Sequence, residues 1–168
     1  MIHHTVISSP MGDILLIADN CGLTTINFQS GCAAKKPPIG SIESSAPFRE
    51  ASRQISAYFK GERIHFDLPL LAQGTPFQKS VWAELVRIPY GETISYRELA
   101  MRVGKPAAWR AVGSANGRNP LPIVVPCHRV IGSDGKLSGY NGGVHLKKYL
   151  LQIESKFKPL LVPSLRSA

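Results

Sequence analysis

The sequence predicts a two-domain protein of mixed α/β (α+β) class, with a small three-stranded antiparallel sheet and a helix followed by a mostly helical domain. Three observations support this fold. Short apolar segments separated by turn-forming residues fill the first 30 positions. Helical spacing with N-terminal capping signals recurs after residue 75. A length of 168 residues is enough for two small domains with a real core.

The first domain is predicted to be a meander with one covering helix. Strands are expected at residues 5–8, 13–18 and 23–28. Residues 29–46 contain Gly, Ser, Lys and a Pro-Pro pair, which is typical of a mobile connection. Pro47 then begins a helix that extends to Gly61, and alternation over residues 64–68 predicts another short strand.

Ala72-Gln73-Gly74 is the best domain boundary, because helix signals begin directly after it. Residues 1–74 would then form the N-terminal α/β domain with its linker. Residues 75–158 would form the second domain, and residues 159–168 a tail.

The second domain begins with three predicted helices. Thr75-Pro76-Phe77-Gln78 is a strong helix start, with a threonine cap, a proline in first position and a glutamine three residues after the cap. Ser95-Tyr96-Arg97-Glu98 repeats the capping pattern and opens a second helix. A turn at Gly104 separates it from a third helix over residues 106–116. Two short helices joined by a tight turn predict a helix-turn-helix.

The third helix carries mostly small side chains, namely Ala107, Ala108, Ala111, Gly113, Ser114 and Ala115. Small residues let a helix approach another backbone closely. Around the protruding Arg110 that backbone could be DNA. Close packing against a neighbouring helix explains the composition equally well.

Charge is divided unevenly along the chain. Residues 1–74 carry six basic and six acidic side chains, whereas residues 75–168 carry fourteen Lys and Arg against five Asp and Glu. The net charge of +9 therefore lies wholly in the second part. Nucleic acid is the commonest partner of such a segment, and a generally basic surface is the alternative.

Several classes of protein are disfavoured by the composition. No apolar run approaches membrane-spanning length, so no membrane association is expected. The N-terminus lacks the pattern of a signal peptide. Cys21, Cys32 and Cys127 are odd in number and unrelated in spacing, which indicates free thiols in a reducing, cytoplasmic compartment.

A reactive motif follows the apolar run 123–125, which predicts a short buried strand or core segment ending at Pro126. Cys127, His128 and Arg129 come next, and basic neighbours favour the reactive thiolate. A structural buried cysteine beside surface charges is the alternative. Adjacent side chains on an extended backbone point to opposite faces, so His128 can reach Cys127 only through a turn or a bridging water. A third group, usually a carboxylate, should orient the imidazole.

The C-terminal part is predicted to contain a flexible, aromatic-bearing loop and one more helix. Gly139-Tyr140-Asn141-Gly142-Gly143 forms the loop. The helix is expected over residues 144–154 with Lys147 and Lys148 exposed, and residues 156–168 resemble a loosely held tail.

These residues together resemble the O6-alkylguanine-DNA alkyltransferases, of bacterial type. The matching stretches are Ile88–Thr93, Ser95-Tyr96, Arg110–Gly113, Asn119-Pro120, Pro126–Val130, Gly139-Tyr140, Gly142-Gly143 and Glu154. The match is continuous from Pro89 to Glu154, whereas residues 1–74 match only through Ser9-Pro10-Met11-Gly12 and the order of elements. The resemblance implies a winged helix-turn-helix and irreversible, stoichiometric transfer of an alkyl group from DNA to Cys127 without a cofactor. O6-alkylguanine is the implied substrate, and O4-alkylthymine a second candidate.

The resemblance also implies roles for single residues. Cys127 would be the nucleophile, activated through a bridging water by His128, which Glu154 would orient. Asn119 would hold the turn beneath the cysteine, and Tyr96 would donate toward guanine N3 as the base leaves. The pocket would be formed by the carbonyls of Cys127 and Val130, the N–H of Asn141, the ring of Tyr140, and Ser138 and Pro122, where pocket size is set.

The implied partner is double-stranded DNA with alkylated bases. A stacked base must be flipped out of the duplex to react, and Arg110 would fill the space it leaves. Its helix would enter the minor groove. Other DNA contacts are expected at Tyr96, Arg97, Ala108, Ala111 and Gly113. A monomer is expected, and cooperative binding on DNA is left open.

Two features depart from the family pattern. Trp109 stands where alanine is usual, and it could pack inward or contact DNA. Asp19 and Thr24 occupy the positions of zinc ligands in some members, so no metal is expected. A non-catalytic lesion binder of alkyltransferase-like type is the main alternative, although Cys127 in its full motif speaks against it. A regulatory DNA-binding domain with an incidental cysteine is a more distant one.

Overall fold

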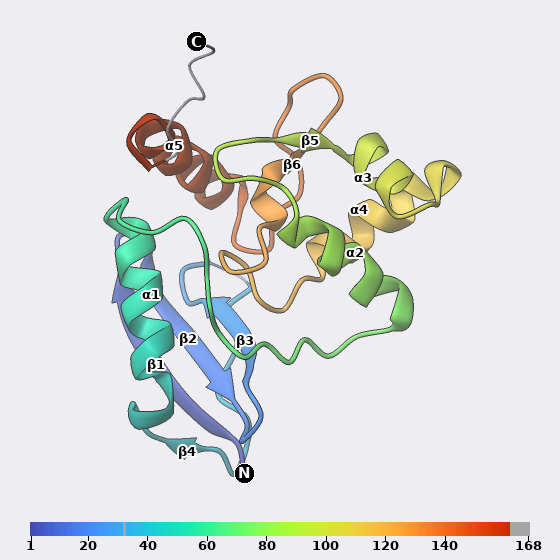
Figure 1. Ribbon diagram of the computed structural model, residues 1–168. Coiled ribbons are helices and arrows are strands. Elements are labelled where there is room, and N and C mark those ends of the chain that lie inside the picture. Colours follow the sequence, from blue (N-terminus) through green and yellow to red (C-terminus); the bar gives the residue numbers. More distant parts are fainter. Residues whose placement is uncertain (32, 162–168) are drawn as a thin grey trace.

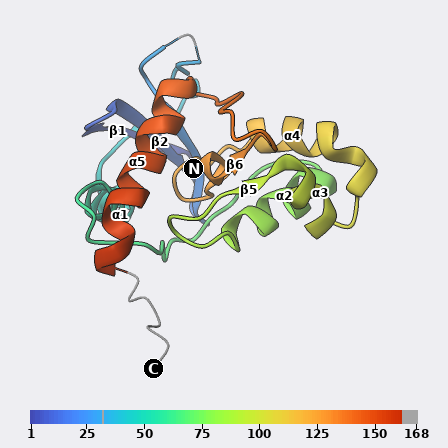
Figure 2. The same cartoon turned by 90° about the horizontal axis from the view of Figure 1, so that it is seen from above.

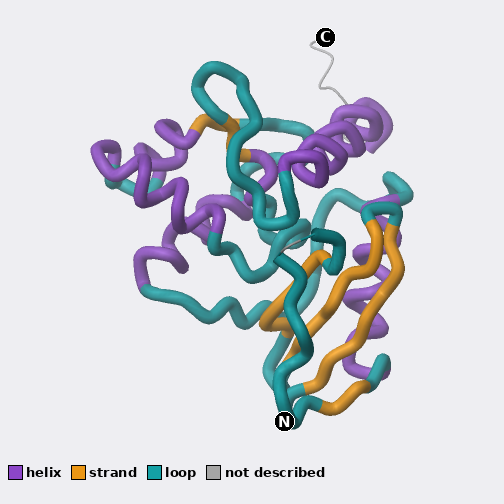
Figure 3. The backbone as a smooth tube through the Cα atoms, turned by 180° about the vertical axis from the view of Figure 1, so that it is seen from behind, coloured by secondary structure: helices purple, strands orange, loops and turns teal. Residues whose placement is uncertain are grey.

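The computed structural model describes residues 1–31 and 33–161, and its two domains lie side by side (Figure 1). A sheet with one covering helix forms the N-terminal domain. A mostly helical domain follows, after a long segment without helix that leads from α1 to α2 (Figure 3). The predicted mixed α+β class is confirmed.

The N-terminal sheet contains the predicted meander of β1 (His3–Ser9), β2 (Gly12–Ala18) and β3 (Leu23–Phe28), all antiparallel. Within the described residues it has a fourth strand, β4 (Ile42–Glu43), which pairs in parallel with β1 and gives the order β3-β2-β1-β4. The prediction of three strands was therefore one strand short. Part of the segment predicted as a mobile connection returns to the sheet edge.

The helical cover of the sheet consists of η1 (Ala46–Phe48) and α1 (Arg49–Phe59). Residues 64–68, all of them described, form no strand, so that prediction was wrong. At Asp67 a side chain, not a neighbouring strand, pairs with the backbone. The buried Gln54 amide accepts from the Asp67 N–H and donates to the Asp67 carbonyl, both at 2.8 Å.

The second domain consists of α2 (Pro76–Val86), β5 (Ile94–Ser95), α3 (Tyr96–Arg102), η2 (Pro106–Ala108), α4 (Trp109–Gly117), η3 (Cys127–Arg129), β6 (Val130–Ile131) and α5 (Val144–Leu161). The predicted capping box is present: Thr75 Oγ1 accepts from the Gln78 N–H, and the Gln78 side chain accepts from the Thr75 N–H. Gly104, at φ 75°, turns the chain between α3 and the η2–α4 segment, which completes the helix-turn-helix. β5 and β6 pair in parallel beside it.

Three expectations for the second domain need correction. Residues 123–125 form a turn and a bend, so of the two predicted alternatives the buried core segment is confirmed and the strand is wrong. Helix α5 continues to Leu161, so the helix end near Glu154 and the loose tail from residue 156 were placed too early. The remainder of the predicted tail, residues 162–168, lies outside the described residues. Lys147 is buried, not exposed.

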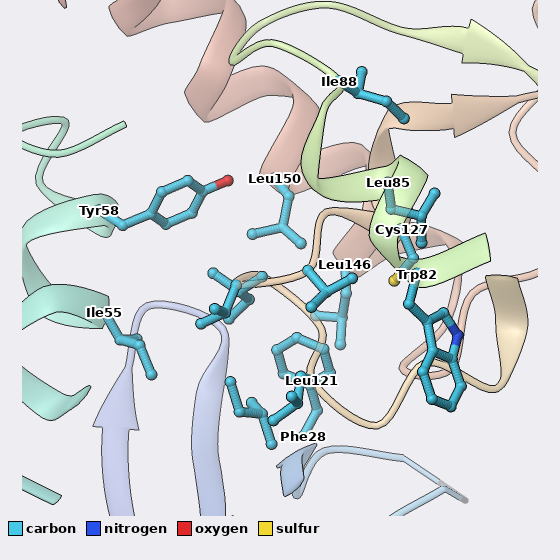
Figure 4. Packing of buried hydrophobic residues seen from close by; sticks show 14 of the residues in the cluster. Phe28, Ile55, Tyr58, Trp82, Leu85, Ile88, Leu121, Cys127, Leu146 and Leu150 are labelled. Atoms are coloured by element: carbon cyan, nitrogen blue, oxygen red, sulfur yellow. The ribbon is translucent and has the colours of Figure 1, made fainter. Parts of the chain in front are cut away.

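One apolar core runs through both domains (Figure 4). Phe28, Ile55 and Tyr58 of the first domain belong to the same cluster as Leu146 and Leu150 of α5. Helix α5 lies above one end of α1 and of the sheet in Figure 1 and passes in front of the sheet in the view from above (Figure 2), and its Phe157 side chain packs over Gly61, just beyond α1. Helix α5 of the second domain therefore contacts the N-terminal domain directly.

Candidate active site

Cys127 begins η3, directly after a tight turn that Asn119 holds from one side. Asn119 accepts from the Leu121 N–H at 3.0 Å and donates to the Val125 carbonyl at 2.7 Å. Ile123 in this turn has φ 74°, a left-handed conformation that costs a non-glycine residue about 1–3 kcal/mol. Its side chain is 1% exposed, so packing holds the strained backbone in place. The chain thus turns before Pro126, and η3 turns it again over Cys127–Arg129.

His128 and Glu154 form a hydrogen bond in the interior, with Nε2 of His128 2.7 Å from Oε1 of Glu154. A carboxylate only accepts hydrogen bonds, so Nε2 carries the proton and Nδ1 is left as the basic nitrogen. Nδ1 is buried and has no hydrogen-bond partner among the described residues. Burial lowers the pKa of His128, and the charges of Arg129 and Lys147 act in the same direction. The imidazole is therefore neutral at neutral pH and can take a proton at Nδ1.

Glu154 accepts hydrogen bonds on both oxygens. Arg129 donates through Nε to Oε2 at 2.9 Å and through Nη2 to Oε1 at 3.0 Å. The Gly91 N–H and the Tyr58 hydroxyl also donate, at 2.9 and 2.8 Å. Burial alone would raise the pKa of Glu154, but the bonds and charges of His128 and Arg129 more than offset it and hold the pKa below its ordinary value. The carboxylate is fixed in position and ionised.

Lys147 lies among the predicted site residues, and sequence reasoning missed it. It is fully buried, and its Nζ donates to the Tyr96 hydroxyl at 3.3 Å and to the Ser138 carbonyl at 3.1 Å. Tyr96 donates to the same carbonyl at 3.2 Å. Among the described residues no carboxylate pairs with Lys147. The helical spacing of Lys147, Leu150 and Glu154 could have revealed that they share one buried face.

Arg129 and Tyr58 were also missed as parts of the site. Arg129 had been noted only as a fixed charge, yet it is buried and also donates to the Ile88 carbonyl. Its position within the Pro126–Val130 motif was the available signal. Tyr58 had no such signal, because its contact with Glu154 joins positions 96 residues apart.

A cavity of about 560 Å³ opens beside these residues. It is lined by Tyr96, Trp109, Arg110, Gly113, Gly117, Ser138, Gly139, Tyr140 and Asn141. Tyr140 also lies next to the Cys127 thiol. Cys127 does not line the cavity and is 4% exposed. Burial raises the pKa of the Cys127 thiol, although the Asn119 side chain and the Lys147 charge oppose this, so the thiol needs a base to react.

The structure brings most of the predicted pocket residues together. Val130 is buried next to the cysteine, and its N–H donates to the Cys127 carbonyl. Asn116 donates to the same carbonyl at 3.3 Å, so this oxygen already has two donors. Arg97, Ala108 and Ala111 are not in the cavity wall.

Of the predicted DNA contacts, Arg110 and Ala111 lie on the exposed face of α4, while Tyr96 and Arg97 belong to α3 and Ala108 to η2. Ala111 and Ser114 are exposed, while Val112, Ala115 and Asn116 make up the buried face. The small side chains are thus not confined to a helix–helix contact. Trp109 is 36% exposed, so it does not pack inward. Its ring centroid lies 4.9 Å from the guanidinium carbon of Arg110 and 5.7 Å from that of Arg97.

The other groups considered in the sequence are possible metal ligands and the remaining cysteines. No cluster of three metal-ligating side chains occurs in residues 1–31 and 33–161. Asp19 accepts from the N–H groups of Cys21 and Gly22 in its own turn. Cys21 is a free, exposed thiol, whereas Cys32 lies outside the described residues.

In the part of the chain that the structure describes, no helix is long and apolar enough to cross a membrane.

A buried thiol next in sequence to a histidine that a carboxylate holds, in a domain with a basic helix-turn-helix, is the combination expected of a DNA-binding protein with a reactive cysteine. The sequence family described as 6-O-methylguanine DNA methyltransferase, DNA binding domain, matches residues 76–156. The ribonuclease-like domain of the same methyltransferase matches residues 2–72. The chain belongs to the 6-O-methylguanine DNA methyltransferase family.

Individual relatives agree over nearly the whole chain. The methylated-DNA–protein-cysteine methyltransferase of Methanosarcina barkeri is 52% identical over 153 residues, which is 91% of this chain and 97% of the relative. That of Mycobacterium tuberculosis is 45% identical over 159 residues, or 95% and 96%. Their name denotes the enzyme class of this chain, transfer of a methyl group from DNA to a cysteine of the protein. The predicted family resemblance is confirmed.

Solved structures show the same fold. The crystal structure of Mycobacterium tuberculosis O6-methylguanine methyltransferase has a TM-score of 0.88 at 44% identity, covering 95% of this chain and 96% of that one. The Mycobacterium tuberculosis OGT in complex with DNA has a TM-score of 0.86 at 44% identity, covering 92% and 94%.

Proposed function

We propose that Cys127 is the acceptor residue and that it takes the alkyl group from O6 of alkylated guanine in double-stranded DNA, once per molecule. The observation that carries this proposal is the buried arrangement of Cys127, His128 and Glu154 beside a cavity on the DNA-facing side. The carboxylate fixes the imidazole, and Nδ1 of His128 is free to accept the thiol proton. A non-catalytic lesion binder would have no use for this arrangement.

In the proposed reaction a water molecule carries the thiol proton from Cys127 to Nδ1 of His128. The thiolate then attacks the alkyl carbon, a carbon–sulfur bond forms and the bond to O6 breaks. The electron pair stays on the guanine, which takes a proton at N3 from the Tyr96 hydroxyl. Lys147 hydrogen-bonds that hydroxyl and can return the proton to it. Its positive charge also stabilises the negative charge that develops on Tyr96 and the base.

The base would be held by groups around the cavity. The Val130 carbonyl would accept from the exocyclic amine, and the Asn141 N–H would meet O6. Tyr140 would supply an aromatic wall and Ser138 would limit the size of the alkyl group. The Cys127 carbonyl is the weaker candidate for the amine, because Asn116 and Val130 already donate to it.

A base inside a duplex cannot reach this cavity, so the lesion would be flipped out through the minor groove. Arg110 would fill the vacated space, and the exposed small residues of α4 would permit close approach of the DNA backbone. Arg97, Ala108, Ala111 and Gly113 would add contacts that do not depend on sequence. Monomeric binding and repair of O4-alkylthymine belong to the same proposal.

The test is incubation with duplex DNA that carries O6-methylguanine with a labelled methyl group. The label should move to the protein and be recovered on the peptide that contains Cys127. Cys21→Ala is the matched control, since Cys21 is an exposed free thiol and its loss should change nothing. Label on Cys21, or no label on the protein, would refute the assignment.

A further inference from the structure

One contact joins the N-terminal domain to the catalytic carboxylate. Tyr58 belongs to α1, and its hydroxyl donates to Oε1 of Glu154 at 2.8 Å. Both side chains are 0% exposed. Figure 4 shows the hydroxyl pointing away from α1 toward Leu150 and the second domain. The same Oε1 accepts from Nε2 of His128, so Tyr58 and His128 share one oxygen.

Resting on the proposed function, we infer that Tyr58 is a positioning residue through which the N-terminal domain sets the proton affinity of the His128–Glu154 pair. The domain would therefore take part in the reaction without touching DNA or the lesion.

Tyr58 acts through the negative charge on Oε1 of Glu154. A hydroxyl that donates to this oxygen spreads its negative charge and reduces the attraction of Glu154 for a protonated imidazole. With Tyr58 in place, His128 stays neutral to lower pH, and Nδ1 remains available as a base. Without the hydroxyl, Oε1 would hold only His128 and Arg129, and the imidazolium would be better stabilised.

The other charged or titratable groups around the pair come from different elements. Arg129 of η3 and Lys147 of α5 add positive charge that disfavours the imidazolium. Tyr90, from the loop after α2, lies near Glu154 but makes no hydrogen bond among the described residues. Cys127 is the group whose proton His128 is to receive. His128, Arg129 and the Gly91 N–H, all in the second domain, also donate to the carboxylate. Tyr58 therefore supplies the only hydrogen bond that Glu154 receives from the first domain in the described part of the chain.

The structure supplies a matched pair of variants. The Tyr58 ring packs against Phe59, Phe66 and Tyr90, with centroids 5.6 to 6.1 Å apart, and phenylalanine would keep this packing. Tyr90→Phe also removes a buried hydroxyl from this aromatic cluster. Unlike the Tyr58 hydroxyl, it has no hydrogen-bond partner among the described residues. The two changes are chemically identical but differ in the hydrogen bond to Glu154.

The experiment measures the rate of alkyl transfer from a free O6-alkylguanine base between acidic and neutral pH. A free base keeps DNA binding out of the measurement. In Tyr58→Phe, the pH at which the rate falls on the acidic side should rise by roughly half a unit to one unit, the size of one net hydrogen bond. Tyr90→Phe should follow the wild type.

A rate that drops equally at all pH values in Tyr58→Phe would show a merely structural role and overturn the inference. So would an unmoved acidic limb, or the same shift in Tyr90→Phe. Absence of transfer in the wild-type protein would instead refute the proposed function. If Tyr58→Phe does not fold, NMR of the wild type decides: the Tyr58 hydroxyl proton should exchange slowly, and rapid exchange would contradict its bond to Glu154.

Discussion

The buried centre around Glu154 and the exposed face of α4 are built in opposite ways. Glu154 receives five hydrogen bonds from α1, η3 and the loop after α2, and every donor is fixed by burial or by the backbone. On α4, Arg110 is exposed and its guanidinium lies over the Trp109 ring, while the next exposed side chains of the helix, Ala111 and Ser114, are small. Proton transfer requires donors and acceptors in fixed positions. Binding DNA of any sequence requires instead a positively charged surface with small side chains that lets the DNA backbone approach.

Cys127→Ala should separate alkyl transfer, which depends on the buried site, from DNA binding, which depends on the exposed face of α4. Transfer should be lost entirely because no nucleophile remains, while affinity for duplex DNA should be unchanged because the α4 face is untouched. Label transfer and DNA binding are measured on the same preparation. Parallel loss of both activities would mean that the centre and the face are not independent.

Arg129→Ala should be the most damaging change to the stability of the centre. Removing one partner of a buried ion pair leaves an uncompensated charge and costs about 3–5 kcal/mol in the free energy of unfolding. Arg102→Ala is the control, because its pair with Glu98 is partly exposed and should contribute at most about 0.5 kcal/mol. Denaturant unfolding measures both. Similar losses would show that burial does not distinguish these pairs.

Arg110→Ala should weaken the exposed face alone. Repair of duplex DNA should fall about tenfold or more, since flipping a base costs a few kcal/mol and the arginine compensates for the gap. Reaction with a free alkylguanine base should not change. Arg118→Ala removes the same charge at the other end of α4 and should affect only the salt dependence of binding. An equal loss on duplex and free base would assign Arg110 to the pocket instead.

The melting temperature should depend on pH through the protonation of Glu154 and His128. The pKa of Glu154 is lower in the fold than its ordinary value of about 4.3, so its stabilisation is complete above that pH and is lost as pH falls toward the folded pKa. His128 also has a lowered pKa, so below about 6.5 the unfolded state takes up the proton first. Both groups act in one direction, and melting temperatures should fall steadily from neutral to acidic pH. A flat profile would contradict the ionised, buried carboxylate.

Features that depend on neighbouring residues in the sequence could be predicted, whereas features that depend on tertiary contacts could not. Strands β1 to β3 and the Thr75 cap are local patterns, and they were correctly predicted. Strand β4 is two residues long and exists only through pairing with β1. The strand expected at residues 64–68 is absent, and the backbone of Asp67 there pairs with the side chain of Gln54 from α1.

The same distinction holds for the site. Cys127, His128 and Glu154 were named from a motif, and the structure places His128 and Glu154 within hydrogen-bonding distance. The positions of Lys147 and Tyr58 depend on tertiary contacts. Lysine is usually exposed, and only the packing of α5 brings Lys147 to Tyr96. Tyr58 reaches Glu154 across the domain boundary, which no local pattern reveals.

The most direct test of the central claim is the number of lesions that one molecule repairs. A thioether on Cys127 has no activated carbonyl and no good leaving group, so no group in the pocket can release the alkyl chain. With excess O6-methylguanine duplex, repaired lesions should equal active protein, and the intact mass should rise by one methylene located at Cys127. Continued repair beyond one lesion per molecule, or repair without this mass change, would contradict the account.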